Sequence, residues 1–145
     1  MFGIPRIPFW LGAAGLLPFL LGATMQFLHE PGGTQLLAAY GTVILCFMSG
    51  VLWGFATRSG GRDQLWAYGF SVLPALYVFF FVENTILSPG RITGGSLPAL
   101  WFGFAGILLL DVLYQMRGLA PRWWMRLRLL ITAVVLACLF IGANI

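Results

Sequence analysis

The sequence predicts an all-α fold, a polytopic integral membrane bundle of five transmembrane helices, and two observations carry this prediction. Of the 145 residues, 60% are hydrophobic and only 8% are charged, whereas about a quarter of a soluble domain is usually charged. The charged residues, eight Arg and four acids, also leave five long runs of the chain without any charge. These two features together exclude an ordinary water-soluble globule.

The five uncharged runs have the length that a membrane-spanning helix needs, roughly 20 apolar residues for a hydrocarbon core of about 30 Å. They comprise residues 7–29, 31–57, 64–82, 92–110 and 129–145. We therefore expect spans near 8–29, 36–57, 65–87, 97–116 and 123–143. Together they make residues 1–145 a single transmembrane domain without a separate soluble part.

The first run, 7–29, could be either a membrane span or a cleaved signal peptide, because Arg6 followed by an apolar stretch is typical of both. The run is longer than the apolar part of a signal peptide, contains Pro18 and ends without a convincing cleavage site. We therefore expect it to remain as the first span. The other runs are continuously apolar and lack the alternation of transmembrane β-strands.

The connections between these spans are short and rich in Gly and Pro, as in Glu30-Pro31-Gly32-Gly33 and Gly118-Leu119-Ala120-Pro121. Successive helices should therefore be antiparallel neighbours. Two further prolines, Pro18 and Pro74, lie well inside the first and third spans. Each removes one backbone hydrogen bond, so we expect a kink at each.

Small residues mark the faces on which membrane helices approach one another closely. Three spans carry such residues, and we expect the following glycines to pack helices against each other: Gly12, Gly15, Gly50, Gly54, Gly103 and Gly106. Contact within the bundle is the favoured interpretation. A dimer interface is the alternative, because Gly50 and Gly54 form a literal GxxxG motif.

The arginines predict the orientation of the chain. One set of connections would carry seven of them, Arg6, Arg58, Arg62, Arg117, Arg122, Arg126 and Arg128, and the opposite side only Arg91. Short loops rich in arginine stay in the cytoplasm. The N-terminus should therefore be cytoplasmic and the C-terminus outside.

Glu83 and Asp111 are the acids within the expected spans, and an intramembrane carboxylate is a candidate functional residue. They lie near opposite ends of their helices, so they cannot form a carboxylate pair. We expect Glu83 to reach the outer interface or pair with Arg91. Asp111 should pair with an arginine of the fourth connection or cap a neighbouring helix, and a proton path is the alternative for both.

Residues for catalysis or for holding a cofactor are scarce. His29 is the single histidine, so a haem with two histidine ligands is excluded, and whether it binds a five-coordinate pigment or haem stays open. Cys46 and Cys138 should lie at different depths, which disfavours a disulfide. No metal-ligand spacing and no catalytic set can be assembled. We expect no enzyme activity, no metal, no cofactor and no nucleic-acid partner.

The segment around the fourth connection is the candidate for binding lipid. Its arginines and tryptophans could hold a doubly charged phospholipid such as cardiolipin at the headgroup level. The residues concerned are Arg117, Arg122, Trp123, Trp124, Arg126 and Arg128. The alternative is that they only anchor the topology.

Several segments resemble the uncharacterised family typified by transmembrane protein 69. These are Pro8 to Phe19, Tyr40 to Ala56, Ser71 to Pro74, and Asp111 followed by Pro121 to Trp124 and Leu127-Arg128. The resemblance covers most of the chain, although Cys46, Met48 and Ser49 depart from the family pattern. It implies a five-helix inner-membrane protein of bacteria, with animal members in mitochondria. It does not indicate an activity, because none is established for the family.

The leading functional hypothesis is an accessory or assembly subunit of a larger inner-membrane complex, respiratory or photosynthetic. The chain is short, lacks catalytic residues, and has 13 Phe, 6 Trp and 4 Tyr for surfaces that face lipid or a partner. A small transporter or channel that uses Glu83 or Asp111 is the rival, and a lipid- or pigment-binding protein is a third possibility. A polar cavity joining the two acids would favour transport, whereas an apolar outer face would favour the accessory role.

Overall fold

The computed structural model describes residues 3–82 and 96–145. Across these residues the chain is helical apart from short connections, and no strand forms. The helices are α1 (Arg6–Gly15), α2 (Leu17–Phe27), α3 (Gly33–Ala56), α4 (Asp63–Ser71), α5 (Leu73–Tyr77), the π-helical turn η1 (Val78–Val82), α6 (Ser96–Met116) and α7 (Trp124–Asn144). The all-α fold expected from the sequence is confirmed.

Five helical stretches among the described residues are long and apolar enough to cross a membrane. They are Arg6–Phe27, Gly33–Ala56, Asp63–Val82, Leu97–Met116 and Trp124–Asn144. They coincide with the five expected spans within a few residues, except that the end of the expected third span, 83–87, lies outside the described residues. The protein is therefore a multi-pass membrane protein.

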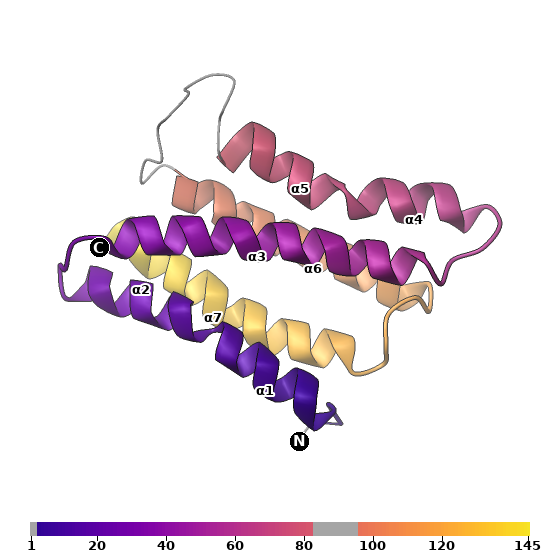
Figure 1. The fold of residues 1–145 in the computed structure, drawn as a ribbon, viewed down its shortest axis with the longest axis horizontal. Helices are drawn as coiled ribbons and strands as arrows, with labels where there is room; N and C mark the ends of the chain where they lie inside the picture. Colours follow the sequence, from indigo (N-terminus) through magenta and orange to yellow (C-terminus); the bar gives the residue numbers. More distant parts are fainter. Residues whose placement is uncertain (1–2, 83–95) are drawn as a thin grey trace.

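Helix α3 runs through the middle of the bundle. Figure 1 shows α2 and α7 on one side of it, α4 and α5 on the other, and α6 behind it. Leu37, Leu45 and Leu52 of α3 are fully buried and form the centre of the core. The two chain ends lie at opposite ends of the bundle (Figure 1), as an odd number of spans requires.

Both expected proline kinks are present, and at each a single residue interrupts the regular helix. α1 ends and α2 begins around Leu16, two residues before Pro18, and α4 gives way to α5 around Val72, two residues before Pro74. Figure 1 shows the bend between α1 and α2 clearly. In each case the proline occupies the first turn of the new helix, where its missing N–H does no harm.

The carbonyl just before each break accepts a hydrogen bond from a hydroxyl of α3. The Tyr40 hydroxyl donates to the Gly15 carbonyl at 3.0 Å, and the Ser49 hydroxyl donates to the Ser71 carbonyl. In a bilayer no water can satisfy backbone groups near a break, so neighbouring side chains must do so. The central helix therefore stabilises the breaks in the two helices beside it.

The glycines expected to pack helices together fall into two groups. A Cβ at Gly12 would lie 2.6 Å from Cδ1 of Ile131, and one at Gly103 would lie 2.7 Å from Cδ2 of Leu45, so both mark close helix contacts. A Cβ at Gly15 would approach only the Tyr40 hydroxyl, at 3.9 Å. For these three positions the neighbouring atoms belong to other helices of the bundle.

Gly50, Gly54 and Gly106 form the second group, and among the described residues the expected contact within the bundle is not seen at them. A Cβ at any of these positions would meet no atom of the described residues within 4 Å. Gly50 and Gly54 lie on an exposed face of α3 that other helices of the bundle leave uncovered. The sequence shows that such glycines permit close approach, but not which face of the helix they occupy.

Gly103 and Gly106, three residues apart on α6, offer a matched test of these contacts. Gly103→Ala should lower the melting temperature of the detergent-solubilised protein, because overpacking costs about 1–3 kcal/mol. Gly106→Ala should leave it unchanged or raise it, because alanine favours a helix by about 1 kcal/mol. Equal effects of the two substitutions would contradict the described packing of α6 against Leu45 and Tyr77.

Candidate functional site

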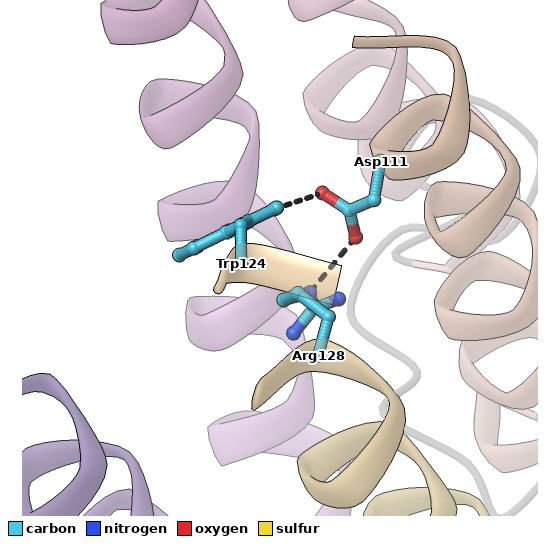
Figure 2. A network of polar contacts seen from close by, with 3 residues as sticks. All are labelled: Asp111, Trp124 and Arg128. Atoms are coloured by element: carbon cyan, nitrogen blue, oxygen red, sulfur yellow. Dashed lines mark hydrogen bonds and ion pairs between the residues drawn. The ribbon is translucent and has the colours of Figure 1, made fainter. Parts of the chain in front are cut away.

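The intramembrane acid Asp111 is fully buried on α6 and binds two side chains of α7. Nε of Arg128 donates to Oδ2 of Asp111 at 2.8 Å, and Nε1 of Trp124 donates to Oδ1 at 2.9 Å. Figure 2 shows the carboxylate reaching both partners. The expected pairing of Asp111 with an arginine of the fourth connection is confirmed, and both carboxylate oxygens are engaged.

The turn between α6 and α7 brings these residues to the same depth. At its C-terminus α6 is closed by Gly118 in the left-handed conformation, with φ of 72°, while Gly118 N–H donates to Gln115 and Leu119 N–H to Tyr114. This is the Schellman arrangement that commonly ends a helix. Trp124 and Arg128 are four residues apart, so they share the face of α7 that Asp111 meets.

Trp124 joins the ion pair to a third helix. Its ring packs edge to face on Phe55 of α3, with the ring centroids 5.0 Å apart. The guanidinium carbon of Arg128 lies 6.0 Å from the centroid of the Trp124 ring, within reach of a cation–π interaction. The site therefore fixes α3, α6 and α7 to one another at the end of the bundle that carries the arginines.

Burial makes this pair mutually dependent. Arg128 is only 3% exposed and Asp111 is 0% exposed. A single charge inside a membrane protein is costly, whereas a hydrogen-bonded pair largely offsets the cost of leaving water. One polar atom of the pair nevertheless has no partner among the described residues, because Nη2 of Arg128 is buried without a hydrogen bond.

The six residues expected to form one lipid-binding surface do not lie on one surface. Trp124 and Arg128 turn inward to Asp111, and Arg117 instead lies near Asp63 at 3.8 Å and over the ring of Trp66. The remaining three residues, Arg122, Trp123 and Arg126, are exposed or half-buried. Counting the arginines on each side of the membrane could not show that one of them, Arg128, is buried in the bundle.

Contacts among the connections at this end were not anticipated from the sequence. Nη1 of Arg58 donates to the Leu119 carbonyl at 3.2 Å, which ties the second connection to the fourth. Nε1 of Trp66 donates to Oδ1 of Asp63 at 2.9 Å, and Asp63 stands in the first turn of α4, where a negative charge is favoured. The three-residue spacing of Asp63 and Trp66 could have predicted this last contact, because residues three apart are neighbours on a helix.

The other singled-out residues lie apart from this site. His29 is exposed and has a φ of 57°, because it closes α2 in the left-handed position of a Schellman turn. Cys46 is exposed on α3, Cys138 is buried in α7, and no disulfide joins them. Among the described residues no group of three or more His, Cys, Asp and Glu could hold a metal ion. Glu83 lies outside the described residues.

A cavity of about 360 Å³ adjoins the ion pair, beside the kink between α1 and α2. Its wall is formed by side chains of α1, α2, α3, α6 and α7, and nearly all of them are apolar. Trp124 and Arg128 also line it, so the cavity reaches the Asp111 site from the side of α7. This volume is within the range of small-molecule sites in proteins, about 300–1,000 Å³.

Comparison with known proteins gives two likenesses. Residues 4–144 match the family described as "Protein of unknown function (DUF3429)". Transmembrane protein 69 of Xenopus tropicalis is 30% identical over 137 residues, which cover 90% of this chain and 51% of that protein. The chain thus spans about half the length of this relative. No solved structure matches the chain.

The ion pair can be tested with single and double substitutions. Asp111→Asn should destabilise the detergent-solubilised protein by about 3–5 kcal/mol, because it leaves Arg128 buried without a counter-charge. The double variant Asp111→Leu with Arg128→Met should recover most of this loss, since neither charge then remains. Unfolding free energies from steric trapping would measure both.

The exposed pair Asp63 and Arg117 is the matched control for this experiment. Asp63→Asn should cost no more than about 1 kcal/mol, because water screens a half-exposed pair. If Asp111→Asn were as mild as Asp63→Asn, the Asp111 pair would not have the structural role described.

Proposed function

Since the chain belongs to the DUF3429 family of proteins of unknown function, we propose its function from the geometry: it is a non-enzymatic accessory or assembly subunit of a larger inner-membrane complex. One observation carries the proposal. Gly50 and Gly54 lie on a face of α3 that the described residues leave open. A glycine within a helix costs about 1 kcal/mol relative to alanine, and in membranes it typically permits a second helix to approach closely.

The face around these glycines has the composition of a helix-docking surface. Val43 and Phe47 precede Gly50 and Gly54 at helical spacing and are strongly exposed. A membrane helix gains nothing from leaving lipid for another apolar surface, so close backbone contact must supply the stability. Two glycines one turn apart, between larger apolar residues, provide such a contact for a helix of a partner protein.

The state of Asp111 supports a structural role over transport. A carboxylate that carries protons must exchange its hydrogen-bond partners, whereas both oxygens of Asp111 are held by Arg128 and Trp124. The adjoining cavity is lined almost entirely by apolar side chains. This geometry supports an acid that fixes three helices together rather than one on a polar path.

The proposal also includes the orientation of the bundle in the membrane and the identity of that membrane. The N-terminus and the connections 57–62 and 117–123 lie at one end of the bundle (Figure 1). Seven of the eight arginines belong to these segments or to the helix turns beside them. We place this end in the cytoplasm of a bacterial cell by the positive-inside rule. The similar protein of Xenopus tropicalis is eukaryotic, and the proposal of a bacterial inner membrane does not extend to it.

Reporter fusions test this topology. Fusions after Gly61 and Leu119 should be active with a cytoplasmic reporter, and fusions after Gly33 and Ile145 with a reporter that works only outside. The reason is the excess of arginine at the end that holds Gly61 and Leu119. A fusion at Ile145 that reads cytoplasmic would contradict both the orientation and the five-span count.

Site-specific photo-crosslinking tests the proposed docking face. A benzophenone side chain at Val43, on the open face of α3, should yield one discrete adduct with a different membrane protein in the native host. Gly50→Ile with Gly54→Ile should remove this adduct and reduce assembly of the complex that contains the partner. The matched control is the same probe at Leu109, an exposed residue of α6, which should capture lipid only.

Two results would contradict the proposal. An adduct only with a second copy of this chain would show a dimer interface in place of an accessory role. Normal assembly of every membrane complex in the glycine double variant would show that the face serves no partner.

A further inference from the structure

The cavity beside α7 exists because two helical features coincide. The break between α1 and α2 around Leu16 bends the first span away from the bundle. Gly15, in the cavity wall, has no side chain to fill the space that results. A Cβ at Gly15 would find its nearest neighbour at 3.9 Å, so this part of the wall is not tightly packed.

The cavity opens sideways, toward the hydrocarbon of the bilayer. Two residues of its wall, Leu11 of α1 and Phe47 of α3, are 69% and 64% exposed and so belong to the outer surface of the bundle. The part of the wall that lies deeper in the span is apolar, with Phe19, Phe104 and Val135. A lipid molecule could therefore enter from the membrane without crossing a polar barrier.

Arg128 is the single charged residue among the described side chains of this wall. Its guanidinium is almost completely buried, and its Nη2 atom has no hydrogen-bond partner among the described residues. A buried donor without an acceptor is unfavourable, and more so when the group is charged. An acceptor supplied from the cavity would remove this cost.

Charge balance decides what kind of acceptor fits. Asp111 already neutralises Arg128 through the bond from Nε. An anion in the cavity would therefore add an uncompensated charge in apolar surroundings, which is expensive. A neutral carbonyl oxygen accepts the remaining N–H without adding charge. Arg128 lies one turn inside the end of α7, near the depth at which the ester groups of phospholipids meet the hydrocarbon.

We propose that this cavity binds one acyl chain of a membrane phospholipid, with the ester carbonyl of that chain accepting a hydrogen bond from Nη2 of Arg128. The acyl chain lies in the cavity against the apolar side chains of α1, α2, α3 and α7, and the lipid headgroup stays outside at the interface. The site differs from a headgroup site for cardiolipin, because it recognises the acyl ester and not the phosphate. It adjoins the partner-docking face around Gly50 and Gly54, because Phe47 belongs both to that face and to the cavity wall.

Photoactivatable lipids test the proposal on the purified protein in nanodiscs. One probe is a phosphatidylcholine that has ester-linked chains and a diazirine in one of them, and the second is the matching ether-linked lipid, which has no carbonyl. Peptide mass spectrometry then locates the adducts. Val51 and Ile131 report on the cavity, and the exposed residues Leu109 and Phe140, outside its wall, report on bulk lipid.

In the wild-type protein the ester probe should label Val51 and Ile131 well above Leu109 and Phe140. The ether probe should label the cavity about tenfold less, because it lacks the carbonyl oxygen that accepts the hydrogen bond and its ether oxygen is a weaker acceptor. An ester-linked phosphatidylglycerol probe should behave as the phosphatidylcholine does. Cavity labelling equal to bulk labelling, or equal labelling by ester and ether probes, would overturn the proposal. A tenfold preference for phosphatidylglycerol would also overturn it by showing an anion site.

Two variants complete the experiment. Arg128→Lys keeps a cation for Asp111, but its single nitrogen, held at the carboxylate, cannot also occupy the place of Nη2. It should therefore lower labelling by the ester probe to that of the ether probe and leave the latter unchanged. Val51→Trp should fill the cavity and abolish labelling at Ile131 by both probes, whereas Leu109→Trp should not. Undiminished labelling at Ile131 in Val51→Trp would reject the cavity as the binding site. The ester and ether comparison in the wild type decides the matter even where Arg128→Lys does not fold.

Discussion

The structure depends on one constraint, that a chain in hydrocarbon must satisfy its own backbone polar groups. Helices meet it by themselves, and so each uncharged run of the sequence becomes a helix. The constraint is hardest to meet where a proline interrupts a span. At both interruptions a hydroxyl of α3 donates to a carbonyl beside the kink, from Tyr40 to Gly15 and from Ser49 to Ser71. Helix α3 therefore makes two kinds of contact from the centre of the bundle. Its leucines form the core, and its hydroxyls donate hydrogen bonds to the two kinked spans.

The same constraint governs the charged side chains. Asp111 and Arg128 can be buried only as a pair, and the pair can form only because the Gly118 turn sets α6 and α7 side by side in the right register. Trp124 then uses its N–H on the carboxylate and its ring on Phe55, so one residue serves both the polar and the apolar requirement. Since replacing such a pair by apolar residues is often neutral, its stability alone does not explain it. Its specific contribution is to fix the relative register of three helices.

The sequence was sufficient to predict the fold class, the five spans, both proline kinks and the pairing of Asp111 with an arginine, because each follows from local composition or from the cost of an isolated charge. It was not sufficient to predict which arginine turns inward, since Arg126 and Arg128 differ only in their position around α7 and Arg122 lies just before that helix. The glycines show the same limit. Gly103 and Gly106 belong to one motif, yet one lies against Leu45 and the other faces away from the bundle. A small residue permits contact, and only the arrangement of the helices decides whether contact occurs.

The departures from ideal helix design are not scattered through the bundle. A proline inside a span, glycines on an outer face and an arginine below the membrane surface each carry a cost, and a sequence selected for stability alone would avoid them. In this protein the Pro18 break, Gly12, Gly15 and Arg128 all border the same lateral cavity, while Gly50 and Gly54 lie on the exposed side of α3. Both places lie on the outside of the bundle. The costs are therefore concentrated where the proposed lipid chain and the proposed partner helix would approach from the side.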